Sequence, residues 1–275
     1  MKLSVYFANR PNMGDRLNVD LIEKYFGYQV KRSTYLTGKV AAIGSGLGNY
    51  TYEEETWKNI LKAASGIFFP EVYIWGMGFV RYKDNDSKFY KRNTHICALR
   101  GELSRKRVEK IMGKPVDVPL ADAGILADGL LDSVPEKKYS MGIIAHYKEQ
   151  DHPVFAELQK RPDSIFIDVR KAPIDVIRDI AACRTVLSSS LHGLIIADSL
   201  HIPNHHLKVT DRLLGDGFKF DDYYSAYGLS HEYTDAAAGH IPTPDEIIDG
   251  YRIDPDQVDR KKEELLKAFP FPSQL

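Results

Sequence analysis

Short apolar runs alternate with amphipathic patterns along the first half of the chain. Apolar, β-branched runs of about four to eight residues are typical of strands, and an apolar period of about 3.6 residues is typical of helices. The pattern predicts strands at residues 3–7, 39–43, 72–75 and 95–99, and helices at residues 15–26 and 102–112. Alternation of this kind predicts an α/β fold.

A second alternating series follows a polar, proline-containing segment at residues 134–138, where we place a domain boundary. It predicts strands at 141–146, 165–169, 185–187 and 204–209, and helices at 154–160, 174–182 and 191–201. The chain therefore divides into two Rossmann-like domains, residues 1–135 and 136–275. Two such domains with a cleft between them form a GT-B-like architecture, which many transferases use to bring a phosphate-bearing donor to a sugar. Residues 255–269 predict an amphipathic helix that packs back on the body.

The segment "TVLSSSLHGLIIADSLHIP" places serines, a histidine and a glycine where a predicted strand changes into a helix. Ser190 is the predicted N-cap, and His192 lies in the first helical turn. A helix start offers unpaired N–H groups and the positive end of the helix dipole, which suit a phosphate or carboxylate. Open α/β sheets bind ligands at the carboxyl ends of their strands, so this turn is expected on the cleft. A core histidine bonded to a backbone carbonyl is the alternative for His192. The predicted binding residues of this turn are Ser189, Ser190, Leu191 and Gly193.

Polar residues also follow the first predicted strand and two strands of the second domain. Asn12, Gly14 and Asp15 follow the first strand, where Asp15 is a possible helix cap and a capped turn without function is an equal alternative. His146 and Arg170 end strands of the second domain. We expect all of these residues at the cleft.

Arg100 stands at a predicted strand-to-helix switch beside Gly101. A guanidinium there suits a carboxylate or phosphate, whereas a solvated charge at a strand end is the alternative. Asp122 follows in "DVPLADAGIL", where an aspartate that only shapes a turn is the alternative to a functional carboxylate.

Two glycine-rich strand ends, "AAIGSGLGNY" and "YIWGMGFV", suggest a backbone surface kept bare for a ligand. The first of them lacks the helix start that a dinucleotide-binding fingerprint requires, so nucleotide binding at this loop is not expected.

Composition narrows the possible partners. Of 275 residues, 43% are hydrophobic and 27% charged, as in globular proteins. Lysine and arginine number 37 against 38 acidic residues, so net charge gives no support for a nucleic-acid partner. No apolar stretch has the length of a membrane span, and the N-terminal apolar run is too short for a signal peptide, so a cytoplasmic location is expected. Cys97 and Cys183 lie in apolar segments, and no His, Cys or acidic residues have metal-ligand spacing, so no metal is expected.

Several motifs in the right order resemble the polysaccharide pyruvyltransferases, in particular the succinoglycan-type ketal pyruvyltransferases of exopolysaccharide biosynthesis. They include "GDRLNVDLI", "IGSGL", "WGMGF", "ALRGELSRK" and "RTVLSSSLHGLIIADSLHIPN", and they span most of the chain. The resemblance implies transfer of pyruvate from phosphoenolpyruvate to a sugar as a ketal, in a GT-B-like fold without a nucleotide cofactor. It further implies an exopolysaccharide or cell-surface glycan precursor as acceptor, lipid-linked at the cytoplasmic face of a bacterial membrane, with peripheral membrane association of the enzyme. The first domain would face the acceptor and the second would hold phosphoenolpyruvate.

The resemblance also assigns roles. The motif histidine falls on His192, and the arginine of the R-G motif falls on Arg100. Many members carry an arginine before the Leu-His pair, where this chain has Ser190; Arg170 or Lys208 is expected to replace it. His192 would protonate the methylene carbon of the enol. The base that accepts the hydroxyl proton stays open between Asp15 and Asp122.

Two other functions fit the same pattern. One is a GT-B glycosyltransferase that uses a nucleotide sugar, which would need a base-stacking pocket and a ribose-binding acid in the second domain. The other is a glycan-binding or regulatory domain without activity. Phosphate release from phosphoenolpyruvate in the presence of glycans distinguishes them.

Overall fold

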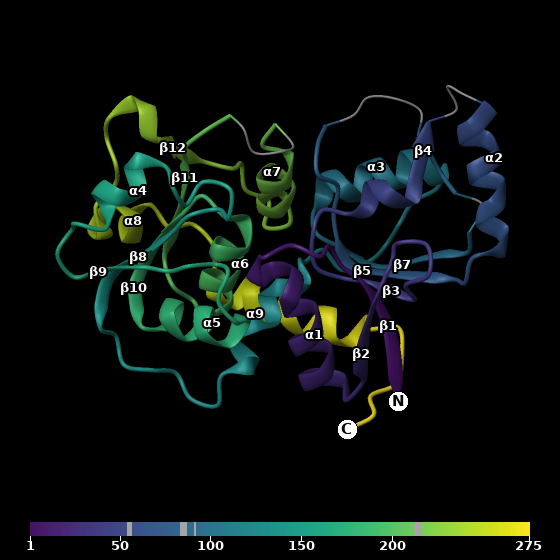
Figure 1. Ribbon diagram of the computed structural model, residues 1–275, viewed down its shortest axis with the longest axis horizontal. Coiled ribbons are helices and arrows are strands. Elements are labelled where there is room, and N and C mark those ends of the chain that lie inside the picture. The colour runs from purple at the N-terminus through teal and green to yellow at the C-terminus, as the bar shows by residue number, and fades with distance from the viewer. Residues whose placement is uncertain (54–56, 83–86, 91, 212–215) are drawn as a thin grey trace.

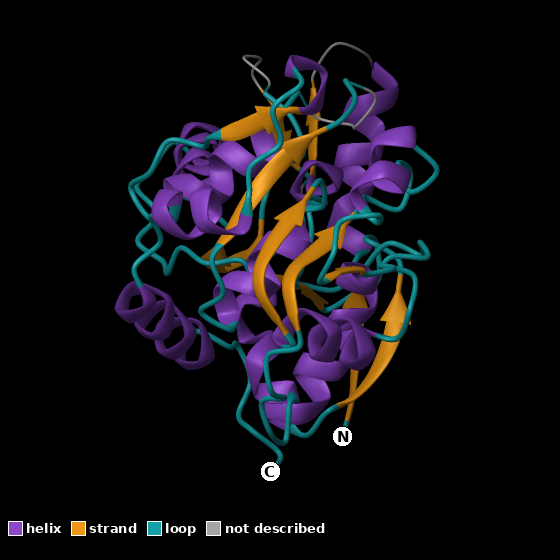
Figure 2. Cartoon of the chain, turned by 90° about the vertical axis from the view of Figure 1, so that its left-hand side faces the viewer, coloured by secondary structure: helices purple, strands orange, loops and turns teal. Residues whose placement is uncertain are grey.

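The computed structural model describes residues 1–275 except 54–56, 83–86, 91 and 212–215 (Figure 1). Two five-stranded sheets, parallel throughout, lie side by side in Figure 1, and helices cover them (Figure 2). The predicted α/β class with parallel sheets is confirmed.

The first sheet has the strand order β2-β1-β3-β5-β7. Its strands are β1 (Lys2–Tyr6), β2 (Gln29–Ser33), β3 (Val40–Ala41), β5 (Val72–Met77) and β7 (Thr94–Leu99). The main helices of this half are α1 (Met13–Phe26), α2 (Trp57–Ser65) and α3 (Glu102–Met112). A small antiparallel pair, β4 (Thr51–Glu53) and β6 (Ser87–Phe89), stands apart from the sheet. Left-handed glycines, Gly27 and Gly113, end α1 and α3.

The second sheet has the order β12-β11-β10-β8-β9. Its strands are β8 (Tyr139–Ile144), β9 (Ser164–Phe166), β10 (Cys183–Ser188), β11 (Asn204–Lys208) and β12 (Tyr233–Asp235). The helices of this half are α4 (Pro153–Leu158), α5 (Pro173–Ala181), α6 (Leu191–Ser199), α7 (Phe218–Ser225), α8 (Pro244–Gly250) and α9 (Pro255–Lys267). β10 lies in the centre of this sheet, as its β-branched, apolar sequence predicts.

Two helices cross between the halves. α1 belongs to the first half by sequence, yet it packs on α5, and Met13 N donates a hydrogen bond to Val169 O at 2.8 Å. α9 belongs to the second half by sequence, yet it reaches the first sheet, where Trp75 Nε1 of β5 donates a hydrogen bond to Leu265 O at 2.8 Å. The predicted packing of the C-terminal helix on the body is confirmed. The division of the chain at residues 135 and 136 stays a prediction.

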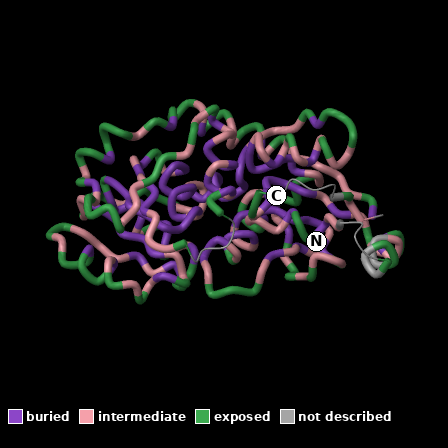
Figure 3. The backbone as a smooth tube through the Cα atoms, turned by 90° about the horizontal axis from the view of Figure 1, so that it is seen from above, coloured by how far each residue is buried: buried purple, intermediate pink, exposed green. Residues whose placement is uncertain are grey.

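The buried core is continuous through both halves, and buried backbone runs along the length of the molecule in Figure 3. One large apolar cluster includes Leu3 and Val5 of β1 together with Leu194 and Ile195 of α6. The carboxyl ends of the strands in the two sheets are therefore held close to one another by shared packing.

Candidate active site

A cavity of about 290 Å³ lies at the carboxyl ends of strands from both sheets. Its lining comes from the loop after β1 and the start of α1, the glycine loop after β3, the loop after β8, the start of α6, and α7. The chemically active members are Arg10, Asn12, Asp15, Ser45, Asn49, His146, Lys148, Ser190, His192 and Lys219. The cavity therefore lies where the sequence predicts a binding site, at the carboxyl ends of the strands.

The turn between β10 and α6 is fixed by its own serines. Ser188 Oγ accepts a hydrogen bond from Ser190 N at 3.0 Å, and Ser189 Oγ accepts one from His146 N at 2.9 Å. Ser190 is the N-cap residue as predicted, but its side chain makes no capping bond, because the turn is already closed by Ser188. The first N–H groups of α6 have no partner within the helix, which leaves them for a ligand.

His192 packs against the backbone of Gly14. A Cβ atom at position 14 would lie 2.2 Å from His192 Nδ1, so only glycine leaves the imidazole in this place. His192 Nε2 is buried and has no hydrogen-bond partner among the described residues. Burial, with Lys219 and Arg100 nearby, lowers the pKa of His192 to about 3. The imidazole is therefore neutral near pH 7 in this state, whereas the sequence suggested a histidine that holds its proton there.

The remaining charges of the cavity are mostly positive. Arg10 Nη1 donates to the hydroxyl of Tyr147 at 3.0 Å, and Lys148 and Lys219 also line the wall. The carboxylate among the lining residues is Asp15, and burial raises its pKa to about 6 although Arg10 opposes the shift. Three cations against one carboxylate leave an excess of positive charge on the wall, which favours an anionic ligand.

His146 lines the same wall beside Tyr147, with ring centroids 4.5 Å apart. Burial, with nearby Lys219, lowers the pKa of His146 to about 3, so this second imidazole is also neutral near pH 7. Its Nδ1 accepts a hydrogen bond from Lys148 N at 3.3 Å, which shapes the loop after β8.

The structure brings most of the predicted site residues together. Six of them lie on the cavity wall: Asn12, Asp15, His146, Ser190, Leu191 and His192. Gly14, Ser189 and Gly193 lie directly behind the wall, where Gly14 and Gly193 leave room for their neighbours. Asp15 is in the first turn of α1 and Asn12 is the N-cap residue, so the predicted cap at Asp15 is wrong.

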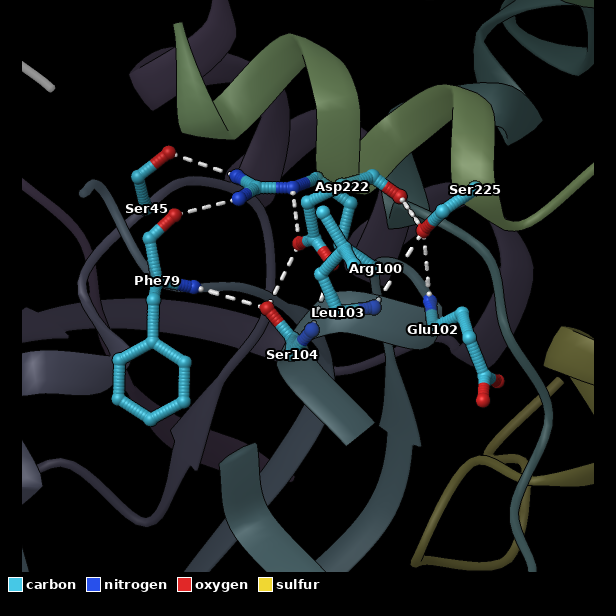
Figure 4. Close-up of polar contacts among 8 residues, drawn as sticks. All are labelled: Ser45, Phe79, Arg100, Glu102, Leu103, Ser104, Asp222 and Ser225. Carbon is cyan, nitrogen blue, oxygen red and sulfur yellow. Dashed lines mark hydrogen bonds and ion pairs between the residues drawn. The ribbon is translucent and has the colours of Figure 1, made fainter. Parts of the chain in front are cut away.

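Arg100 lies behind the wall rather than on it, contrary to the prediction. Its side chain has no exposed surface, because it is closed in by an ion pair with Asp222 at 2.9 Å and by a hydrogen bond to Ser45 Oγ at 2.6 Å (Figure 4). Arg100 Nη2 also donates to Phe79 O. Ser45 lines the cavity, so the guanidinium lies one side chain away from it.

Asp122 lies outside the cavity as well. It is fully buried at the start of the 3₁₀ helix Ala123–Leu130, where Oδ1 accepts a hydrogen bond from Gly124 N at 2.9 Å. Burial raises the pKa of Asp122 to about 6. This position fits the turn-shaping alternative, and it leaves Asp15 as the candidate base on the cavity wall.

Arg170 and Lys208 do not replace the arginine that is missing at Ser190, contrary to expectation. Arg170 forms an ion pair with Asp168 at 2.9 Å, and Lys208 forms one with Asp211 at 2.8 Å. Neither is among the residues that line the cavity, and each pairs with a carboxylate two or three residues away in the sequence.

Several lining residues were not among the predicted binding residues. Lys148 follows His146 at a strand end that the sequence already places at the cleft, and the cavity lining includes it. Arg10 lies just after the first predicted strand, and Ser45 and Asn49 belong to the glycine loop, so their positions in the sequence could have indicated them. Lys219 stands between two phenylalanines in "GFKF", where nothing in the sequence distinguishes it from a surface lysine.

No group of three or more His, Cys, Asp or Glu side chains in the described part of the chain is arranged to hold a metal ion. Among the described residues, no helix combines the length and the apolar character needed to span a bilayer. The expected independence from metal stays a prediction.

Comparison with known proteins identifies the family. The family model "Polysaccharide pyruvyl transferase" matches residues 12–211, and the chain belongs to this family. The uncharacterized protein L143 of Acanthamoeba polyphaga mimivirus is 26% identical over 232 residues, which cover 82% of this chain and 75% of that protein. The succinoglycan biosynthesis protein ExoV of Rhizobium meliloti is 22% identical over 233 residues, which cover 84% of this chain and 66% of ExoV.

Among solved structures, the functionally uncharacterized protein KP1_0663 of Klebsiella pneumoniae is similar, with a TM-score of 0.49 and 14% identity. The similarity covers 85% of this chain and 92% of that one. The predicted family and the predicted enzyme class, a pyruvyltransferase, are confirmed by the family match and ExoV. The class of reaction is transfer of pyruvate to a glycan.

Proposed function

We propose that this chain transfers the pyruvyl group of phosphoenolpyruvate to two hydroxyls of one sugar, forming a ketal and releasing phosphate. The observation that carries the proposal is one cavity that combines His192, the start of α6, and the cations Arg10, Lys148 and Lys219. Phosphoenolpyruvate carries a phosphate and a carboxylate, and cationic side chains with free N–H groups bind both. No nucleotide or metal takes part in this scheme.

The reaction divides into proton transfers and additions. His192 delivers a proton to the methylene carbon of phosphoenolpyruvate, and a sugar hydroxyl adds to the adjacent carbon while it loses its own proton. Asp15 accepts that proton. Phosphate then leaves and takes up the proton held by Asp15, and a second hydroxyl of the same sugar adds to the carbon while its proton passes to the now neutral His192. The products are the ketal and inorganic phosphate.

His192 must be protonated before it can act as the acid. Burial lowers the pKa of His192, and Lys219 and Arg100 lower it further because a second positive charge nearby is unfavourable. A bound donor with several negative charges reverses the sign of this local field. Donor binding would therefore raise the pKa of His192, so that the imidazole is protonated when the donor is bound.

We place the acceptor on an exopolysaccharide or cell-surface glycan precursor. In this proposal the acceptor is lipid-linked, and the enzyme is a cytoplasmic, GT-B-like protein that works at the inner face of a bacterial membrane. The similarity to ExoV, a succinoglycan biosynthesis protein, supports a bacterial exopolysaccharide acceptor.

The direct test mixes the protein with phosphoenolpyruvate and a panel of glycans, and measures phosphate release together with the mass of the pyruvylated sugar. His192→Gln is expected to stay folded and to keep donor binding, while turnover falls by about 10²–10⁴-fold, the usual contribution of general acid catalysis. His240→Gln is the matched control, because His240 is exposed and pairs with Glu246.

Three outcomes contradict the proposal. A folded His192→Gln protein with wild-type turnover removes His192 from the acid role. Release of a nucleoside diphosphate from a nucleotide sugar, without phosphate release from phosphoenolpyruvate, favours the glycosyltransferase alternative. Glycan binding without any turnover favours a binding domain.

A further inference from the structure

Lys219 is a cation on the wall of the cavity. Among the described residues, no carboxylate lies within ion-pair distance of its ammonium group, which rests 4.9 Å from the ring of Phe220. Burial, with Arg100 and Lys148 as neighbouring positive charges and Glu149 in opposition, lowers its pKa to about 8. A desolvated charge without a counter-ion costs free energy, and a negatively charged ligand in the cavity would offset that cost.

The helix that carries Lys219 is fixed to the first half by a buried polar cluster. Asp222, one turn after Lys219 on α7, accepts hydrogen bonds from Arg100 Nε at 2.9 Å and from Ser104 N at 2.7 Å. Ser225 Oγ accepts one from Glu102 N at 2.9 Å (Figure 4). The cluster joins α7 to the first turn of α3, although α7 lies between β11 and β12 of the second half.

Two glycines of the sequence motifs make this cluster possible. A Cβ atom at Gly101 would lie 1.7 Å from Asp222 O, and one at Gly78 would lie 2.5 Å from Arg100 Cζ. The R-G and G-M-G motifs therefore leave space for the Arg100–Asp222 pair, in addition to any bare surface that faces a ligand.

We propose that Lys219 binds an anionic group of the donor in place of the arginine that is absent at Ser190, and that Arg100 and Asp222 are positioning residues that hold α7. Ser190 and Lys219 line the same cavity, while Arg170 and Lys208 are held outside it. This inference rests on the proposed function, since it names the residue that recognises the phosphate or carboxylate of phosphoenolpyruvate.

Donor binding tests the role of Lys219. Isothermal titration with phosphoenolpyruvate and, separately, with inorganic phosphate compares the wild type with Lys219→Met and Lys219→Arg. Loss of one charge-assisted hydrogen bond is expected to weaken phosphoenolpyruvate binding by about ten- to a hundredfold in Lys219→Met, and Lys219→Arg is expected to retain most of the affinity. Lys208→Met is the matched control, because this lysine is paired outside the cavity. A folded Lys219→Met protein with wild-type affinity overturns the proposal.

A double variant tests whether Lys219 stands in for the family arginine. Ser190→Arg is expected to restore phosphoenolpyruvate binding when it is combined with Lys219→Met. A folded double variant that binds no better than Lys219→Met overturns the equivalence of the two positions.

The positioning role is tested by non-additivity. Asp222→Asn is expected to weaken donor binding, and to add little further loss in the Lys219→Met background, because both changes remove the same contact. Ser225→Ala is a milder second variant that loosens α7 without leaving a buried charge unpaired. Additive losses, or a folded Ser225→Ala protein and a folded Asp222→Asn protein that both bind as the wild type does, overturn the positioning role.

The two probes separate this inference from the proposed function. Binding of inorganic phosphate that depends on Lys219, in a protein that does not consume phosphoenolpyruvate, supports the anion site and contradicts the function. Consumption of phosphoenolpyruvate by a Lys219→Met protein with unchanged donor affinity supports the function and overturns the anion site.

Discussion

Gly14→Ala is the sharpest test of the contact between α1 and His192. The added Cβ would lie 2.2 Å from Nδ1, 2.5 Å from Cγ and 2.7 Å from Cε1 of the imidazole. Carbon atoms pack at about 3.5–4.0 Å, so the ring has to move by about 1 Å or more to relieve the contact. A misplacement of about 1 Å of a catalytic group costs on the order of 10²-fold in rate, which is the loss we expect in turnover.

Stability is expected to change much less than turnover. Gly14 does not have a positive φ, so alanine fits the backbone there and is favoured over glycine by about 0.4–1 kcal/mol through the entropy of the unfolded chain. Overpacking of a buried contact costs about 1–3 kcal/mol, so the two effects partly cancel and the variant stays folded. The assay measures phosphate release from phosphoenolpyruvate with an acceptor, alongside the melting temperature.

Gly48→Ala is the control, because a Cβ at this position meets only Phe79, at 4.0 Å. It is expected to keep wild-type turnover. A folded Gly14→Ala protein whose turnover stays within a few-fold of the wild type would refute the reasoning, since the imidazole would then tolerate displacement without loss of rate.

Three further predictions concern pH and metals. Burial raises the pKa of Asp122 from 3.8 to about 6, so the stability that its protonated form contributes is lost as pH rises through that interval. Asp122→Asn is therefore expected to have a higher melting temperature than the wild type at pH 8 and to keep turnover. Loss of turnover in this variant would show that Asp122 takes part in catalysis. Phosphoenolpyruvate affinity is expected to fall above about pH 8 in titration calorimetry, as Lys219 loses its proton beside Arg100, Lys148 and Glu149, and a Lys219→Met protein with the same profile would assign the effect elsewhere. Exhaustive chelation is expected to leave phosphate release unchanged, and loss restored by one added metal would contradict this.

The sequence predicted the elements that bury apolar side chains, and it missed those stabilised by backbone pairing or by distant partners. β2, with the sequence QVKRS, has little apolar character, because it is an edge strand that pairs with β1 through its backbone. α7 was missed for another reason. Its sequence FKFDDYYS mixes charges with aromatic residues, and its position depends on Arg100, more than one hundred residues away.

The candidate site divides in the same way. His192, Ser190 and Asp15 were predictable because they stand next to strand ends, and parallel strands bring these ends to one edge. The positions of arginine and lysine side chains were predicted poorly, because a local sequence pattern does not reveal whether a carboxylate from a distant segment pairs with them. Arg100 has a buried partner, whereas Lys219 has no carboxylate partner among the described residues.

The helix α9 also has a consequence for the order in which the chain can fold. Phe269, which follows α9, stacks on Phe26 of α1 with ring centroids 3.6 Å apart, and Trp75 of β5 packs edge-on against it. During synthesis the chain emerges from its N-terminus, so the first half is complete in sequence long before this aromatic layer exists. The nascent first half must therefore expose Phe26 and Trp75 until residue 269 has been made. Chaperones that bind exposed aromatic side chains can contact this surface until then. The two halves are expected to acquire their final stability together.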